Sequence, residues 1–290
     1  MEENKELLKP KNDIVFQSLF TQKNENITKN FISAIMEEKI TKIKINTQKE
    51  LYREKPTDKL GILDLEAEIN DKEKVDIEVQ LIDRKNLVER MLFYFSKLYA
   101  STIDKGEDYI DAKKVVIIAI IDYDLDLTKQ IKEMETVWNI IERKNKNLML
   151  TDKLELHIIE LRKAREEYKK NKANKKAQWM MFINNPNEVE VQEIMKENKE
   201  IEEAVVEIRE MTQDEKLERL AFLRQKAIMD EKAIYAAGLD KGELRGKEVG
   251  RKEGRKEGIK ETAKKMKEEN LPLELIEKIT ELTKDEIKKL

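Results

Sequence analysis

The chain has 290 residues, enough for one large or two modest domains, and 39% of them are hydrophobic. Charged residues make up 41%, the formal net charge is −3, and only 4 Pro and 8 Gly occur, which excludes a generally disordered chain. The absence of cysteine excludes disulfides, thiolate metal sites and cysteine nucleophiles. The single histidine, His157, excludes a multi-histidine zinc site, and its alternating surroundings identify it as an ordinary strand residue.

The N-terminus is polar and is not followed by an apolar segment of the kind found in signal peptides. The longest apolar run, residues 115–121, is far shorter than the roughly 18 residues that a membrane-spanning helix requires. We therefore expect a cytoplasmic protein.

The first half of the chain has the patterning of an α/β fold. Three segments have the apolar spacing of helices: residues 13–20, 27–38 and 85–103. Residues 62–69 and 75–81 alternate between apolar and polar side chains, which predicts two strands of a hairpin joined at residues 70–72. Residues 115–121 are continuously apolar, as in a strand buried on both faces. Two further strands are expected at residues 134–142 and 154–161.

The predicted hairpin brings two acidic residues together on its polar face. With a loop at residues 70–72, Asp64 lies directly opposite Glu78, and opposed Cβ atoms are about 4.5–5.5 Å apart. Two carboxylates at that distance repel each other unless a cation lies between them, and Mg²⁺ prefers such oxygen ligands. The backbone carbonyl of Val79 is a candidate third ligand.

A magnesium ion at this place would polarise a phosphate oxygen and lower the pKa of a bound water, as phosphodiester hydrolysis requires. Gln80 lies on the same face and could orient water or phosphate. The following helix presents Arg90, Tyr94 and Lys97 at helical spacing, where they could stabilise transition-state charge. The alternative is that the alternating acids form only a solvated sheet face, which is common in so charged a chain.

After about residue 160 the strand patterns stop and Lys/Glu-rich helical patterns begin. Helices are expected at residues 176–184, 188–197, 199–210 and 213–236. Residues 162–176 contain eight Lys/Arg and two Glu, and residues 238–267 contain eleven Lys/Arg and six acids. Each basic patch can bind phosphate or can form a solvated helix face.

Glycine recurs at every fourth position in the tail: Gly238, Gly242, Gly246, Gly250, Gly254 and Gly258. Each glycine costs a lone helix about 0.8–1 kcal/mol. The repeat is therefore either a helix that packs closely against another helix or a flexible linker, and the pattern leaves both open. Residues 270–290 predict two short helices, the second with a capping box from Thr283 to Glu286.

Several segments, in this order and spacing, resemble the PD-(D/E)XK nuclease family transposases, also called recombination-promoting nucleases. The two central segments are Leu63-Asp64-Leu65-Glu66-Ala67-Glu68 and Val75-Asp76-Ile77-Glu78-Val79-Gln80-Leu81. The others are residues 11–20, 90–99, 106–109, 151–157, the glycine repeat and residues 271–290. Each segment is short, but together they cover most of the chain.

The resemblance implies an α/β restriction-endonuclease-like core, a mixed sheet flanked by helices, followed by an all-α charged C-terminal region. We expect a nuclease-like domain at residues 1–165, a helical region at 166–236 and a glycine-repeat tail with a terminal helical hairpin at 237–290. The implied activity is Mg²⁺- or Mn²⁺-dependent cleavage of DNA in transposition or recombination. DNA is the expected partner, and the helical C-terminal region is the expected surface for a homo-oligomer.

The resemblance also implies roles for individual residues. Asp64 matches the metal-binding aspartate, and Glu78 matches the acid of the (D/E)-x-K element. Gln80 occupies the lysine position, so the positive charge is either lost or moved to Arg90 or Lys97. Asp13 is a further supporting candidate. The rival interpretation is a degenerate nuclease fold that serves as a DNA- or protein-binding assembly module.

Overall fold

The computed structural model describes residues 5–46 and 64–290. The chain forms two compact units, residues 1–228 and 229–290. The division into a nuclease-like domain, a helical region and a tail, with boundaries after residues 165 and 236, stays a prediction. Within the described part of the chain, no helix is both long and apolar enough to cross a membrane.

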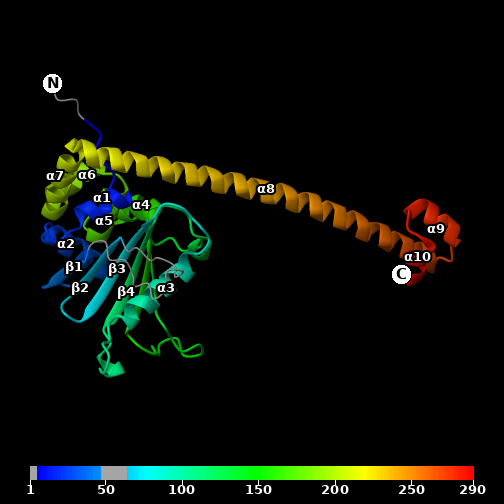
Figure 1. The fold of residues 1–290 in the computed structure, drawn as a ribbon, viewed down its shortest axis with the longest axis horizontal. Coiled ribbons are helices and arrows are strands. Elements are labelled where there is room, and N and C mark those ends of the chain that lie inside the picture. Colours follow the sequence, from blue (N-terminus) through cyan, green and yellow to red (C-terminus); the bar gives the residue numbers. More distant parts are fainter. Residues whose placement is uncertain (1–4, 47–63) are drawn as a thin grey trace. The chain divides into compact units, whose positions relative to one another are not determined.

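The first unit is built on a six-stranded mixed sheet with the order β1-β2-β3-β4-β6-β5 (Figure 1). The strands are β1 (Ile43–Asn46), β2 (Leu65–Ile69), β3 (Glu73–Gln80), β4 (Lys114–Ile121), β5 (Glu135–Trp138) and β6 (Leu154–Glu160). Strands β3, β4 and β6 are parallel, and the outer strands pair antiparallel. The predicted mixed sheet flanked by helices is confirmed, although the short strand β1 was not predicted.

The β2–β3 hairpin has the predicted register, with Leu65 opposite Ile77 and a tight turn after Ile69. The ladder ends at Leu65, however, so the prediction that Asp64 pairs directly with Glu78 is wrong. Asp64 lies in a bend before β2, where its carboxylate accepts a 2.8 Å hydrogen bond from the backbone N–H of Val79. Residues 62 and 63, also assigned to this strand, lie outside the described residues.

Helices cover both faces of the sheet. Those of the first unit are α1 (Asp13–Leu19), α2 (Glu25–Met36), α3 (Leu87–Ala100), α4 (Ala164–Lys170), α5 (Lys175–Asn184), α6 (Val189–Glu197) and α7 (Lys199–Gln213). Short 3-10 turns are η1 (Tyr109–Asp111), η2 (Asp126–Thr128) and η3 (Leu161–Lys163). Helix α3 packs through Met91 and Leu98 against the side of β4 that contains Ile117. The other helices pack against the opposite side, which contains Ile118.

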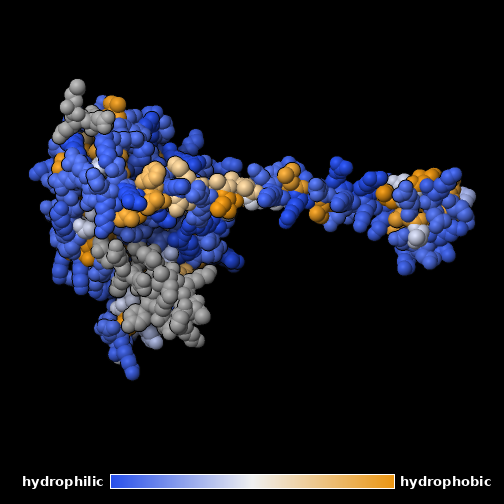
Figure 2. Space-filling view, turned by 45° about the horizontal axis from the view of Figure 1, so that its top comes forward, coloured by the Kyte–Doolittle hydropathy of each residue, from blue (hydrophilic) through white to orange (hydrophobic). Residues whose placement is uncertain are grey.

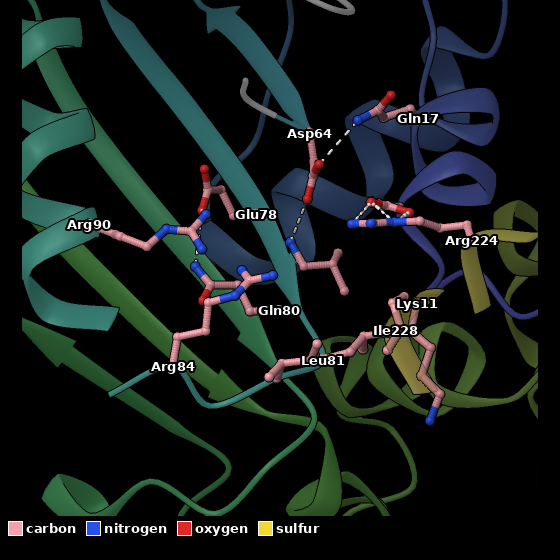
Figure 3. A pocket seen from close by; sticks show the side chains of 13 residues that line it. Lys11, Gln17, Asp64, Glu78, Gln80, Leu81, Arg84, Arg90, Arg224 and Ile228 are labelled. Carbon is pink, nitrogen blue, oxygen red and sulfur yellow. Dashed lines mark hydrogen bonds and ion pairs between the residues drawn. The ribbon is translucent and has the colours of Figure 1, made fainter. Parts of the chain in front are cut away.

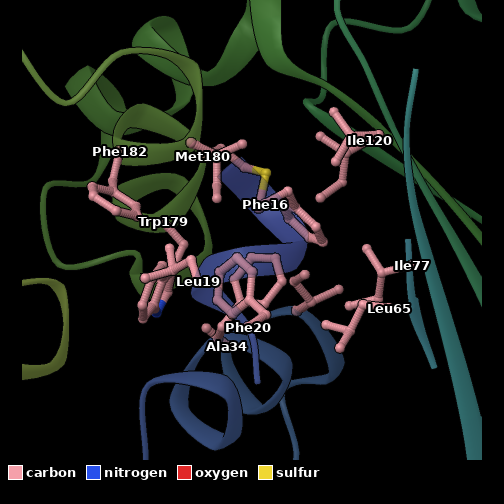
Figure 4. Packing of buried hydrophobic residues seen from close by; sticks show 14 of the residues in the cluster. Phe16, Leu19, Phe20, Ala34, Leu65, Ile77, Ile120, Trp179, Met180 and Phe182 are labelled. Atoms are coloured by element: carbon pink, nitrogen blue, oxygen red, sulfur yellow. The ribbon is translucent and has the colours of Figure 1, made fainter. Parts of the chain in front are cut away.

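The larger core joins the beginning and the later part of this unit. Phe20 stacks on Phe31 with ring centroids 4.4 Å apart, and Phe31 meets Trp179 of α5 edge-on at 5.3 Å. Figure 4 shows Phe20 and Trp179 in this core. Helix α5 is buried from Lys176 to Ile183. Its apolar side chains lie on all sides of the helix rather than along one stripe. The sheet and helices α5–α7 therefore share one core.

Helix α8 (Glu215–Glu268) begins in the first unit, where Ala221 and Ile228 join the larger core. The second unit contains the rest of α8, α9 (Leu273–Thr280) and α10 (Lys284–Lys289), with the predicted capping box at Thr283. The glycine repeat lies within helix α8, which rules out the flexible linker, whereas close packing of the repeat against another helix stays a prediction. A Cβ added at the repeat glycines would meet nothing within 4 Å. Exposed apolar side chains of α8 form separate patches among charged ones (Figure 2).

Candidate active site

A cavity of about 380 Å³ opens at the carboxyl end of β3 (Figure 3). Its lining residues are Lys11, Asp13, Gln17, Asp64, Glu78, Val79, Gln80, Leu81, Ile82, Arg84, Arg90, Arg224 and Ile228. Three of the predicted site residues on or next to the hairpin, Asp64, Glu78 and Gln80, thus meet in one cavity. They do so together with Asp13, the first residue of α1.

Asp64 is fixed at both carboxylate oxygens. Oδ2 accepts the hydrogen bond from Val79, and Oδ1 accepts a 3.1 Å bond from the side-chain amide of Gln17 (Figure 3). Burial raises the pKa of Asp64 to about 6; the Val79 hydrogen bond opposes this shift and the nearby charge of Asp13 adds to it. A buried carboxylate next to a second acid is stabilised by a cation.

Glu78 is held by two neighbours at one oxygen. Its Oε2 accepts hydrogen bonds from the Gln80 amide at 3.0 Å and from Nη2 of Arg90 at 3.1 Å. Arg90 also donates to the Tyr94 hydroxyl at 3.1 Å. The other oxygen, Oε1, is buried and has no hydrogen-bond partner among the described residues. Burial raises the pKa of Glu78 to about 7, against the opposing effect of Arg90.

The face of the hairpin that carries these acids is not a solvated surface. Glu66 is 1% exposed and Asp76 is fully buried, and on the same side of the sheet Arg90 and Tyr94 of α3 lie against Glu78. Neither oxygen of Asp76 has a hydrogen-bond partner among the described residues. Burial raises the pKa of Asp76 well above its usual value, and the negative charge of Glu78 adds to this shift. The alternative of a merely solvated sheet face is therefore wrong.

Four cationic side chains line the cavity. The position of the motif's lysine is occupied by Gln80, which is uncharged. They are Lys11, Arg84, Arg90 and Arg224. Of the two predicted replacements for the lysine, Arg90 lies in the cavity lining and Lys97 does not. Tyr94 contacts the site through Arg90 and directly through Glu78, whose pKa its hydroxyl lowers.

Three cavity residues, Lys11, Arg84 and Arg224, were not predicted from the sequence. Arg224, from α8, contacts Asp13 through Nε at 2.7 and 2.9 Å and through Nη2 at 2.6 Å. Lys11 donates to Asp122 and Asn184 at 2.9 Å each. Lys11 lies two residues before Asp13 in a segment that carries the family resemblance, so the sequence could have indicated it as a site residue. Arg224 is 211 residues from its partner Asp13, and no sequence pattern links the two.

The donors present fit a divalent metal that retains much of its water. Among the described residues no cluster of three or more acidic, histidine or cysteine side chains could hold an ion. Mg²⁺, however, is usually bound through one or two carboxylates and keeps several waters. Asp64, Glu78 with its unpartnered Oε1, and the carbonyl of Val79 make up such a set.

Comparison with known proteins gives one clear relationship. No curated protein and no solved structure matches the chain. Residues 10–238, which include every residue that lines the cavity, match the family described as PD-(D/E)XK nuclease family transposase. The mixed sheet with flanking helices is consistent with the restriction-endonuclease-like fold expected of that family. The chain therefore belongs to the PD-(D/E)XK nuclease family transposases.

Proposed function

We propose that this protein is a metal-dependent DNA endonuclease that acts in transposition or recombination. Asp64, Glu78 and the carbonyl of Val79 hold Mg²⁺ or Mn²⁺. The observation that carries the proposal is the pair of buried carboxyl groups in one cavity, each with a raised pKa and one with an unpartnered oxygen. Such a pair is stable in its ionised form only with a cation nearby. PD-(D/E)XK nucleases usually use divalent metals.

When bound, the metal ion supplies Lewis-acid activation of the phosphate and a water of lowered pKa. The protein side chains position the reactants. Gln80 donates its amide N–H to Glu78, which leaves its amide oxygen to accept a hydrogen bond from water. Arg90 and Arg84 line the same cavity and stabilise the charge that develops on the phosphate. These two arginines supply the positive charge that the lysine of the motif would otherwise provide.

Incubation of the purified chain with supercoiled plasmid tests the proposal directly. We expect nicked and linear DNA with Mg²⁺ or Mn²⁺, and none with a chelator. The Asp64→Asn variant serves as the control for a contaminating nuclease. DNA binding without any nicking under these conditions would instead identify the chain as a binding module on a degenerate nuclease fold.

Gln80 is expected to tune the reaction. Gln80→Ala removes the hydrogen bond to the Glu78 carboxylate, worth about 1.5–3 kcal/mol, and should slow nicking by roughly 10- to 150-fold. Gln80→Lys restores the usual residue of the motif and should retain activity. Single-turnover nicking rates measure both effects. A Gln80→Ala variant as inactive as Asp64→Asn would give Gln80 an essential role.

The helical C-terminal region is proposed to contact DNA phosphates and to associate with a second copy through its glycine row. Gly246→Leu with Gly250→Leu should lower the oligomeric mass measured by light scattering, because bulky side chains prevent close helix contact. Gly246→Ala with Gly250→Ala is the control. Alanine should stabilise the helix by about 0.8–1 kcal/mol per site, since the added Cβ atoms meet no neighbour within the chain. An unchanged mass in the leucine variant would mean that the row is not a contact surface.

A further inference from the structure

The outer edge of the sheet at β5 is unusually apolar. Strand β5 is the last strand in the order, and the described residues add no further strand to its outer side. The chain continues from β5 into a hairpin arm, residues 139–150, held together by hydrogen bonds between Leu150 and Ile140 and between Glu142 and Leu148. Along residues 137–150 seven large apolar side chains are exposed: Val137, Trp138, Ile140, Ile141, Leu148, Met149 and Leu150. Exposed apolar surface of this extent marks an interaction site.

This edge has none of the usual protection against strand addition. Natural edge strands are protected by charges, prolines or covering elements. Between Glu135 and Glu142 the chain reads Thr-Val-Trp-Asn-Ile-Ile, with no charge, proline or glycine. The segment can therefore accept another strand without burying a charge.

The backbone has a defined alternation along this edge. The carbonyl of Met134 accepts from Glu160, and the carbonyl of Ile140 accepts from Leu150. Even-numbered residues of segment 134–142 thus direct their backbone groups into the sheet and the arm. Because directions alternate along a strand, Val137, Asn139 and Ile141 direct theirs toward the open edge.

We propose that a second copy of this chain adds to the sheet here, antiparallel, with a two-fold axis through Asn139. An antiparallel pair needs outward-directed residues opposite one another, so Asn139 pairs with itself and Val137 with Ile141 of the partner subunit. The same register sets Arg143 of the partner subunit beside Glu135, whose carboxylate also contacts His157 and Lys176. A two-fold axis moved to Trp138 would set Val137 opposite an asparagine and lose the apolar match.

The edge lies away from the proposed active site. The cavity is at the carboxyl end of β3, whereas the arm departs beside Leu156, near the amino end of β6. Strands β3, β4 and β6 run parallel, so the two places are at opposite ends of the sheet. A second copy at β5 leaves the cavity open. The inference goes beyond the proposed nuclease function and does not depend on it.

Cysteine cross-linking tests the register, because the chain contains no native cysteine. In full-length Asn139→Cys the two thiols would face each other across the axis with Cα atoms about 5.5 Å apart, within reach of a disulfide. Oxidised glutathione should convert most of this variant to a species of twice the mass on a non-reducing gel. Val137→Cys is on the same edge but lies opposite Ile141 of the partner subunit. The two introduced thiols are then four residues apart along the strand, so this variant should remain uncrosslinked. Efficient cross-linking of Val137→Cys, or none of Asn139→Cys, overturns the proposal.

A charge variant tests the surface independently. Val137→Lys with Ile141→Lys should lower the mass measured by light scattering, because the two-fold axis sets like charges opposite each other. Tyr109→Lys with Ile110→Lys inserts the same charge at exposed positions away from the edge and should leave the mass unchanged. Thermal unfolding by circular dichroism confirms that both variants are folded. A mass that the edge lysines leave unchanged overturns the proposal. An oligomer held only by the C-terminal helix would give that result. An edge variant with unchanged mass but weakened DNA binding would assign the edge to DNA.

Discussion

Asp64→Asn should abolish DNA nicking while the protein stays folded. The asparagine oxygen can still accept the hydrogen bond from the Val79 N–H, which holds the bend before β2, while its NH2 group replaces the oxygen that accepts from Gln17 and can donate to the Gln17 side-chain oxygen once that amide turns over. The negative charge that attracts the metal is lost. Loss of several kcal/mol of Lewis-acid stabilisation lowers the rate by roughly a thousandfold or more. Glu78→Gln should have the same effect on nicking.

These two variants make a second, opposite prediction for stability. Each removes a buried ionisable group whose ionised form is disfavoured, so the metal-free variants should unfold at the same or a higher temperature than the parent at pH 8. Circular dichroism melting curves in chelator measure this. Full nicking activity in both variants would remove Asp64 and Glu78 from the metal site.

The stability of the metal-free protein should fall as pH rises from about 4 to about 7. Burial raises the pKa of Asp64 to about 6 and that of Glu78 to about 7. The folded state then binds more protons than the unfolded state in this window, so its stability is highest below the unfolded pKa values and is lost as pH rises through the folded ones. For Asp64 alone the loss is roughly 3 kcal/mol, or a fall in melting temperature of very roughly 6–12 °C.

Divalent metal should reverse that loss. Because the ion binds the ionised carboxylates, Mg²⁺ or Mn²⁺ should raise the melting temperature more at pH 8 than at pH 5.5. The double variant Asp64→Asn, Glu78→Gln is the control, and its melting temperature should depend less on pH and on metal. An equal metal-induced shift in the control would place the ion elsewhere in the protein.

The hairpin is the part of the site that the sequence predicts best. Alternation over two strands, with a loop at residues 70–72, determined the register of Leu65 and Ile77 correctly. Alternation reports which side chains share a face, but not what covers that face. Asp76 and Glu66 are buried by packing from distant parts of the chain, and no local pattern reveals this. The bend at Asp64 was missed for a similar reason, since its partner is a backbone N–H on the neighbouring strand.

Other parts of the site depend on contacts between distant segments. Arg224 reaches Asp13 because α8 packs against α1 in the folded unit. Its own surroundings in the sequence are those of a charged surface helix. Strand β1 was too short to show a period of two, and the edge position of β5 depends on the strand order, which alternation does not encode. Periodicity therefore predicts elements, whereas tertiary packing decides which side chains meet.

The aromatic cluster that joins α1 and α2 to α5 has a consequence for synthesis of the chain. Phe31 leaves the ribosome 148 residues before Trp179, its neighbour in the core. At about 5–20 residues per second, that interval lasts roughly 7–30 s. During this time the apolar face formed by Phe16, Phe20 and Phe31 has no partner from α5. Folding of this core during synthesis is therefore delayed until α5 has left the ribosome.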